Sequence, residues 1–147
     1  GCYTNALNTI DQQLKVRPDD PGALFYKGNA CLQLNNYAEA IAPLTKVVQM
    51  ETNNFSKAHY LALFMRAKAY LGMQKLEEAK ADYEALRQAL PNEFPVYFDL
   101  GEIAYREKDT NSAIRNYELY KSHAPTNSTD ELKLVNSRLA ELKHGSP

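Results

Sequence analysis

The sequence predicts an all-α fold built from repeats of about 34 residues, and two observations predict it. First, small residues recur in pairs twelve positions apart: Gly28 with Ala40, Ala67 with Ala79, and Gly101 with Ala113. Second, the last two copies are offset by 34 residues and the first two by 39, which is 34 plus five. Small side chains at both positions allow two antiparallel helices to approach closely, so each copy is expected to form a packed helix pair.

Larger residues keep the same register in each copy. They are Leu24, Leu63 and Tyr97 before the first small residue, and Leu44, Tyr83 and Tyr117 after the alanine. The register also extends backwards to Tyr3, Ala6 and Ile10. One helix pair cannot bury both of its faces, so the repeats are expected to stack around a continuous core.

The period and these residues resemble the tetratricopeptide repeat, a helix-turn-helix unit. The resemblance covers essentially the whole chain and implies a right-handed α-solenoid. It departs from the family pattern where Leu or Tyr replaces the usual Trp, and where Lys27 and Arg66 stand at a position that is usually Leu. We expect one domain over 1–147, made of a half repeat at 1–20, repeats at about 21–54, 60–93 and 94–127, and a capping helix at about 129–144.

Local signals place the individual helices. We expect them at 3–16, about 21–34, from residue 36 onward, at roughly 56–73, 76–90, 95–107 and 110–123, and from residue 128 to near 145. Asp20 is expected to cap the second helix with Pro21 in its first turn, and Pro43 to kink the third. Ser128 and Glu131 form a capping-box pattern at the start of the last helix. Asn35, Gln74 and Lys108 stand where the family favours glycine before a turn.

The five extra residues of the first copy lie in the stretch 51–60. We expect most of them to extend the helix that contains Phe64 towards its N-terminus, because 56–60 contains no Gly or Pro. That extension would carry Phe55, His59 and Tyr60 past the rim of the solenoid. The alternative is that Phe55 folds back over the core between repeats.

Composition excludes several classes of function. The chain of 147 residues has a net charge of -1, so it lacks the basic face that sequence-independent binding of nucleic acid needs. No apolar run is long enough to span a bilayer. There is no phosphate-binding glycine loop, metal-ligand spacing or activated nucleophile, and His59, His123 and His144 are scattered and read as surface residues. We therefore expect a non-enzyme without cofactor or metal, whose partner is a protein or peptide.

The cysteines and the start of the chain leave the location open. Cys2 and Cys31 read as free thiols, which favours a reducing, cytoplasmic compartment. The pair Gly1-Cys2 also resembles the end of a bacterial lipoprotein signal, which would tether the protein to a membrane through Cys2. Gly1 stands in the same register as Asn35, so we favour a third interpretation, truncation of a longer solenoid.

The resemblance also implies where binding occurs, because the first helix of each pair lines the inside of the arc. The residues expected there are Phe25, Asn29 and Leu32, then Phe64, Lys68 and Leu71, then Phe98, Glu102, Tyr105 and Arg106. The phenylalanines could pack between repeats, contact a ligand, or do both.

One subset of the family binds terminal carboxylates of chaperone tails through Lys, Asn and Arg side chains. Of those positions only Asn29 matches here, since Phe25, Met65, Pro95 and Asp99 occupy the others. On the expected groove the positive charges of Lys68 and Arg106 balance the negative charges of Asp99 and Glu102. The two acids are expected on solvent-exposed helix faces. We expect a partly apolar peptide or helix as ligand, and thus a non-catalytic interaction scaffold. The alternative is a structural segment of a larger assembly, which self-associates through open solenoid ends.

Overall fold

The computed structural model describes residues 2–50, 57–93, 95–125 and 129–145. Over these ranges the chain forms eight α-helices and no strand, which confirms the all-α class. The chain divides into two compact units, Gly1–Asp82 and Tyr83–Pro147. The boundary lies inside α5 (Leu76–Ala89). The single domain that we expected over the whole chain stays a prediction.

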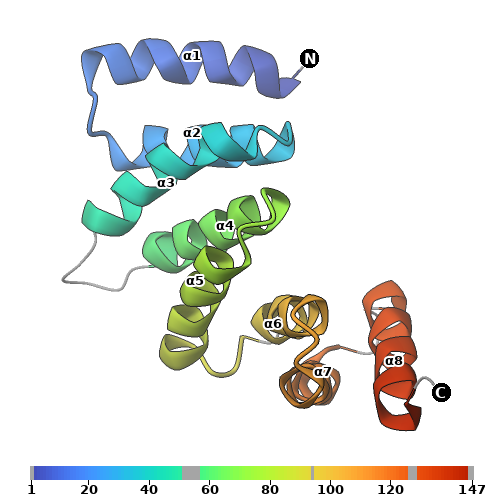
Figure 1. Ribbon diagram of the computed structural model, residues 1–147. Coiled ribbons are helices and arrows are strands. Elements are labelled where there is room, and N and C mark those ends of the chain that lie inside the picture. The colour runs from blue at the N-terminus through green and yellow to red at the C-terminus, as the bar shows by residue number, and fades with distance from the viewer. Residues whose placement is uncertain (1, 51–56, 94, 126–128, 146–147) are drawn as a thin grey trace. The chain divides into compact units, whose positions relative to one another are not determined.

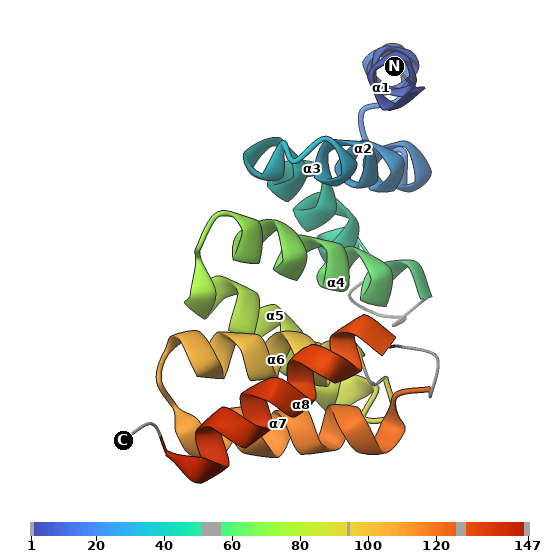
Figure 2. The same ribbon diagram turned by 90° about the vertical axis from the view of Figure 1, so that its right-hand side faces the viewer.

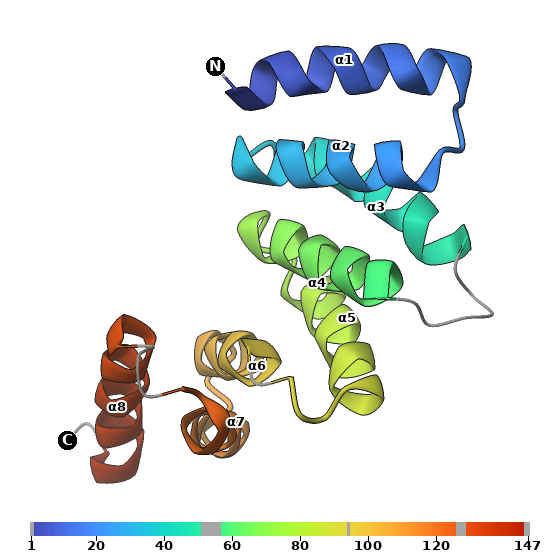
Figure 3. The ribbon, with the colours of Figure 1, turned by 180° about the vertical axis from the view of Figure 1, so that it is seen from behind.

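The first unit contains four complete helices (Figure 1). They are α1 (Cys2–Val16), α2 (Pro21–Gln33), α3 (Tyr37–Met50) and α4 (Lys57–Gly72). α1 runs alongside α2, as the view from behind also shows (Figure 3), and α4 contacts both α2 and α3. α2 and α3 contact each other and form one helix pair, and α4 is the first helix of the next pair.

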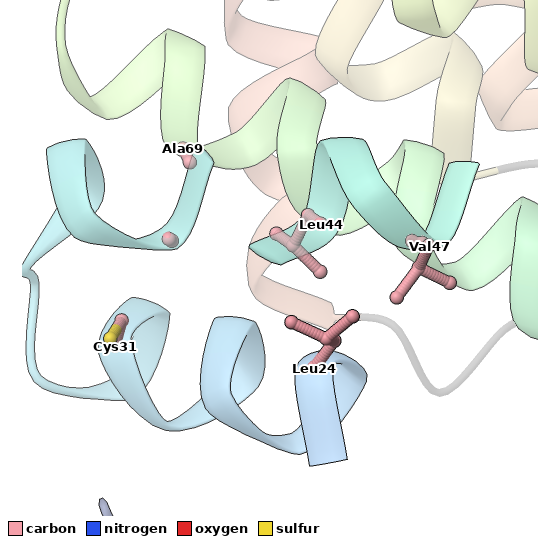
Figure 4. Packing of buried hydrophobic residues seen from close by; sticks show 7 residues of the cluster. Leu24, Cys31, Leu44, Val47 and Ala69 are labelled. Carbon is pink, nitrogen blue, oxygen red and sulfur yellow. The ribbon is translucent and has the colours of Figure 1, made fainter. Parts of the chain in front are cut away.

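The core of the first unit lies between α2, α3 and α4 (Figure 4). Leu24 on α2 faces Leu44 and Val47 on α3, while Cys31 lies further along α2, at the end of the cluster where Ala69 of α4 lies. A Cβ atom on Gly28 would clash with the side chain of Leu44. The glycine is needed there because it allows the close crossing of α2 and α3.

The start of α2 follows the prediction. The carboxylate of Asp20 accepts a hydrogen bond of 2.8 Å from the backbone N–H of Ala23, and Pro21 occupies the first turn. Pro43 lies inside α3, where it removes one N–H donor from the helix.

Three turns between paired helices share one conformation. Asn35, Gln74 and Lys108 have φ values of 59°, 59° and 60°, in the left-handed region that favours glycine. In each turn this residue and the next donate backbone hydrogen bonds back to the end of the preceding helix, for example Asn36 to Cys31 at 2.8 Å. This is the Schellman pattern of helix termination. The shared register that the sequence indicated is therefore a shared backbone geometry.

The second unit contains the rest of α5, then α6 (Pro95–Arg106), α7 (Thr110–His123) and α8 (Thr129–His144). α6 and α7 lie side by side, and α8 crosses α7 (Figure 2). Tyr117 and Tyr120 on α7 and Val135 on α8 are fully buried in its core. A Cβ atom on Gly101 would lie 2.7 Å from the ring of Tyr117, so the close crossing of the first unit is repeated here.

The predicted extension of the helix that contains Phe64 is present. α4 begins ten residues before Ala67, whereas α2 and α6 begin seven and six residues before Gly28 and Gly101. The expectation that His59 projects past the rim, or lies on the surface, is wrong, because its side chain is only 6% exposed. Its ring packs edge-on against Tyr60, with ring centroids 5.7 Å apart. Phe55 and Ser128 lie outside the described residues.

Candidate functional site

The expected binding residues of the first unit lie on two helices that contact each other, α2 and α4. Phe25, Asn29 and Leu32 lie in a stripe along α2, and Phe64, Lys68 and Leu71 lie in the matching stripe along α4. We call the two stripes together the α2–α4 face, since their helices contact each other. Lys68 is exposed and the other residues of the face are partly buried.

The aromatic residues of this face have two roles. Phe25 and Leu32 pack partly against the core cluster of the first unit, so they contribute to its stability. The ring of Phe25 also meets Tyr26 edge-on at 5.8 Å, and Tyr26 is 62% exposed. The Lys68 ammonium lies 4.8 Å from the centroid of the Phe64 ring, within the range of a cation–π contact. The face thus presents half-exposed rings to solvent.

The expected binding residues on α6 are partly covered by α8. The Tyr105 hydroxyl donates a hydrogen bond of 2.7 Å to Glu141, and the Arg138 guanidinium lies 3.8 Å from the Tyr105 ring centroid. Phe98 packs against the same core as Leu139 of α8. Arg106 remains exposed. Sequence reasoning missed these contacts, although the apolar stripe of α8 indicated that it would cover the last core.

The two acids of α6 were expected on a solvated helix face, and this expectation is wrong. Asp99 is 8% exposed. The side chain of Glu102 is 14% exposed and accepts a hydrogen bond of 2.6 Å from the Tyr117 hydroxyl. Burial and this bond to Glu102 raise the pKa of Tyr117 far above its ordinary value. Both acids of α6 therefore have little exposure to solvent, whereas Arg106 on the same helix is exposed.

Two basic residues stand where the family pattern has leucine, and each has an acidic partner. The Lys27 ammonium lies 2.6 Å from a carboxylate oxygen of Asp11 on α1. Arg66 donates hydrogen bonds to both carboxylate oxygens of Asp82, at 2.8 and 2.7 Å, and a third to Thr45 at 3.1 Å. The bond to Asp82 raises the pKa of Arg66. The charges at these two positions are neutralised within the first unit.

An open hollow between α1 and α2 was not predicted. It has a volume of about 620 Å³ and is lined by Asn8, Asp11, Gln12, Leu14, Lys15 and Lys27. Five of these residues lie on α1 and Lys27 lies on α2, so the hollow is separate from the residues of the α2–α4 face.

The structure offers little material for chemistry. Cys31 is buried and unbridged, and burial followed by the charge of Glu39 raises the pKa of its thiol, which keeps it protonated. The described residues contain no cluster of His, Cys, Asp or Glu that could hold a metal ion. Of the eight helices described, none combines the length and the hydropathy that crossing a membrane requires.

Comparison with known families decides the classification. The sequence pattern of the tetratricopeptide repeat matches residues 1–54 and 64–128. The chain belongs to the tetratricopeptide repeat family. The matched ranges include the small residues at the two helix crossings, Gly28 and Gly101.

Two curated tetratricopeptide repeat relatives match part of the chain. DnaJ homolog subfamily C member 3 from Gallus gallus is 36% identical over 100 residues, which is 63% of this chain and 18% of that protein. RNA polymerase II-associated protein 3 from Homo sapiens is 28% identical over 104 residues, which is 71% of this chain and 15% of that protein. The matched region therefore spans less than a fifth of either relative.

Solved structures of MamA share the fold. MamA 41-end from Desulfovibrio magneticus RS-1 superposes with a TM-score of 0.77 at 23% identity, over 88% of this chain and 70% of that one. A crystal structure of MamA protein gives a TM-score of 0.79 at 18% identity, over 98% and 77% of the two chains. At these identities the likeness shows the fold alone, and the repeat fold predicted from the sequence is confirmed.

Proposed function

We propose that this chain is a non-catalytic protein-interaction scaffold that binds a peptide or a helix of a partner protein on the α2–α4 face. The family fold and the tetratricopeptide repeat relatives support a protein-interaction role in general. The observation that carries the specific proposal is the row of half-buried apolar side chains along α2 and α4.

The exposure of neighbouring residues extends this row. Tyr26 is 62% exposed and touches Phe25, while Leu61 is 39% exposed and lies one helical turn before Phe64 on the same side of α4. Large apolar side chains that remain exposed beside a half-buried row form the kind of surface that binds peptides. A partner's apolar side chains would cover Tyr26 and Leu61 and gain hydrophobic stabilisation there.

Selection from a random peptide library, displayed without a free C-terminus and performed on the complete chain, tests the proposal. Peptides that bind the parent should bind Tyr26→Ser and Leu61→Ser variants at least several-fold more weakly, because each loses apolar contact area. Leu134→Ser is the matched control, since Leu134 on α8 is also 39% exposed. If no peptide is enriched from this library or from one with free C-termini, or if all three variants bind equally well, the α2–α4 face is not a binding site.

Self-association is a second candidate function, and the exposure of α1 favours it. Tyr3 and Val16 on this helix are 47% and 80% exposed. Light scattering coupled to size exclusion separates the two candidates. A monomer supports the scaffold, whereas an oligomer that dissociates when Tyr3 and Val16 are changed to Ser supports self-association.

A further inference from the structure

The two helices of the α2–α4 face contain no acidic residue. Neither the sequence of α2 nor that of α4 has an Asp or a Glu, although the chain has 18 such residues. Both helices carry basic residues: Lys27 on α2, and Lys57, Arg66 and Lys68 on α4. By contrast, α6 carries both Asp99 and Glu102. The face of the first unit is therefore of one charge sign.

The four cations divide into two kinds. Lys27 and Arg66 are neutralised by Asp11 and Asp82 on other helices of the first unit. Lys57 and Lys68 are exposed, and no carboxylate of the described residues lies within ion-pair distance of either ammonium group. The two helices of the face therefore carry two exposed positive charges, those of Lys57 and Lys68.

The exposed cations stand on the same side of α4 as the apolar row. Lys57 precedes Phe64 by seven residues, which is close to two helical turns, and Lys68 follows it by slightly more than one. The Lys68 ammonium is held 4.8 Å from the Phe64 ring centroid. A ligand carboxylate that reaches Lys68 therefore comes to lie beside Phe64, where a neighbouring apolar side chain of the same ligand can pack.

We propose, on the basis of the proposed function, that the α2–α4 face selects an acidic peptide segment, one in which an Asp or Glu side chain stands close to a large apolar side chain. Lys68 pairs with the carboxylate, while Phe64 and Leu61 receive the apolar group. The carboxylate belongs to a side chain rather than to a chain terminus, because Phe25 and Met65 replace the Lys and Asn that hold terminal carboxylates in the family.

Charge reversal on the complete chain tests the proposal. The same displayed library, with no free C-terminus, is selected on the parent, on Lys68→Glu and on Lys121→Glu. Lys121 is an exposed lysine of α7, so it provides a control with the same change of net charge. Parent and Lys121→Glu should enrich peptides with Asp or Glu beside an apolar residue, and Lys68→Glu should enrich Lys or Arg instead. Amidated copies of the parent's peptides should bind Lys68→Glu about tenfold more weakly than the parent.

The outcomes separate this proposal from the proposed function. One outcome is that the enriched peptides depend on Leu61 but contain no preferred Asp or Glu, or that Lys68→Glu enriches the same acidic peptides as the parent. The assignment of a carboxylate to Lys68 is then wrong, while the proposed scaffold function still holds. If peptides bind only with a free terminal carboxylate in a repeat of the experiment with unblocked peptides, the side-chain assignment is wrong. Loss of affinity on adding NaCl, seen in the parent but not in Lys68→Ala, supports the ion pair.

Discussion

Arg66 and Asp82 form a two-point ion pair across the first unit, with Nε and Nη2 of the arginine 2.8 and 2.7 Å from the two carboxylate oxygens. The side chains are 15% and 10% exposed. Arg66 stands where the family usually has leucine, so an apolar contact has been exchanged for a polar one that needs both partners. Thr45 accepts a further hydrogen bond from the same guanidinium, which fixes its orientation.

Removing one partner of this pair should be costly. Arg66→Leu leaves the Asp82 carboxylate almost buried without its cation, and the free energy of unfolding should fall by about 3–5 kcal/mol. The double variant Arg66→Leu, Asp82→Leu should recover most of the loss, because two apolar groups replace the pair. Urea unfolding of the parent, both single variants and the double variant measures the coupling. Additive losses in the double variant would show that the pair does not act as a unit.

The glycine at the helix crossing of the second unit should not tolerate a methyl group. In Gly101→Ala the new Cβ would meet the buried ring of Tyr117 at 2.7 Å, and the overpacking should cost about 1–3 kcal/mol. Ala67 stands at the same register position and already has a fully buried Cβ, so Ala67→Gly should cost the helix propensity and the lost burial of a methyl group, together about 1–2 kcal/mol. Thermal melting gives both values, and a Gly101→Ala variant as stable as the parent would contradict the packing described.

The left-handed residues of the turns should be improved by glycine. Gln74 and Lys108 have φ values of 59° and 60°, so Gln74→Gly and Lys108→Gly should each raise the free energy of unfolding by about 0.5–1 kcal/mol by relieving the strain of a Cβ. Lys121→Gly, inside α7, should lower it by about 1 kcal/mol. A melting temperature that falls in the two turn variants would mean that these side chains make contacts worth more than the strain.

α8 should detach when its buried position is made polar. Val135 is fully buried between α8 and the core of the second unit, so Val135→Asp places an unpaired carboxylate there and should release α8. Asn136→Asp makes a similar change at an exposed neighbouring position and serves as the control. Amide hydrogen exchange should become fast along α8 in the first variant alone. Unchanged protection in Val135→Asp would show that α8 does not depend on this contact.

The sequence predicts the helices well, because their determinants are local or periodic. Asp20 and Pro21 start α2 as expected. α4 has the predicted extension because the residues between Lys57 and Phe64 include no Gly or Pro that would end the helix. The shared register of Asn35 and Lys108 also predicted a shared turn. These features depend on residues close together in the chain or repeated at a fixed offset.

The burial of particular polar side chains could not be predicted in the same way. His59 was expected at the surface, yet it is buried, and Asp99 and Glu102 were expected in solvent. Amphipathic patterns place a residue on a helix face, but they do not show which neighbouring helix covers that face. Glu102 contacts Tyr117 on α7 and Arg138 on α8. These two residues lie 15 and 36 positions further along the chain than Glu102.

A partner peptide is predicted to bind the α2–α4 face, and chemical-shift mapping of the complete chain checks this prediction. Titration of the labelled chain with a peptide selected on the parent should shift amide signals along 22–33 of α2 and 61–72 of α4. The signals of α7 should stay in place. Shifts confined to α1 and the hollow beside Lys27, or to α8, with α4 unaffected, would contradict the claim.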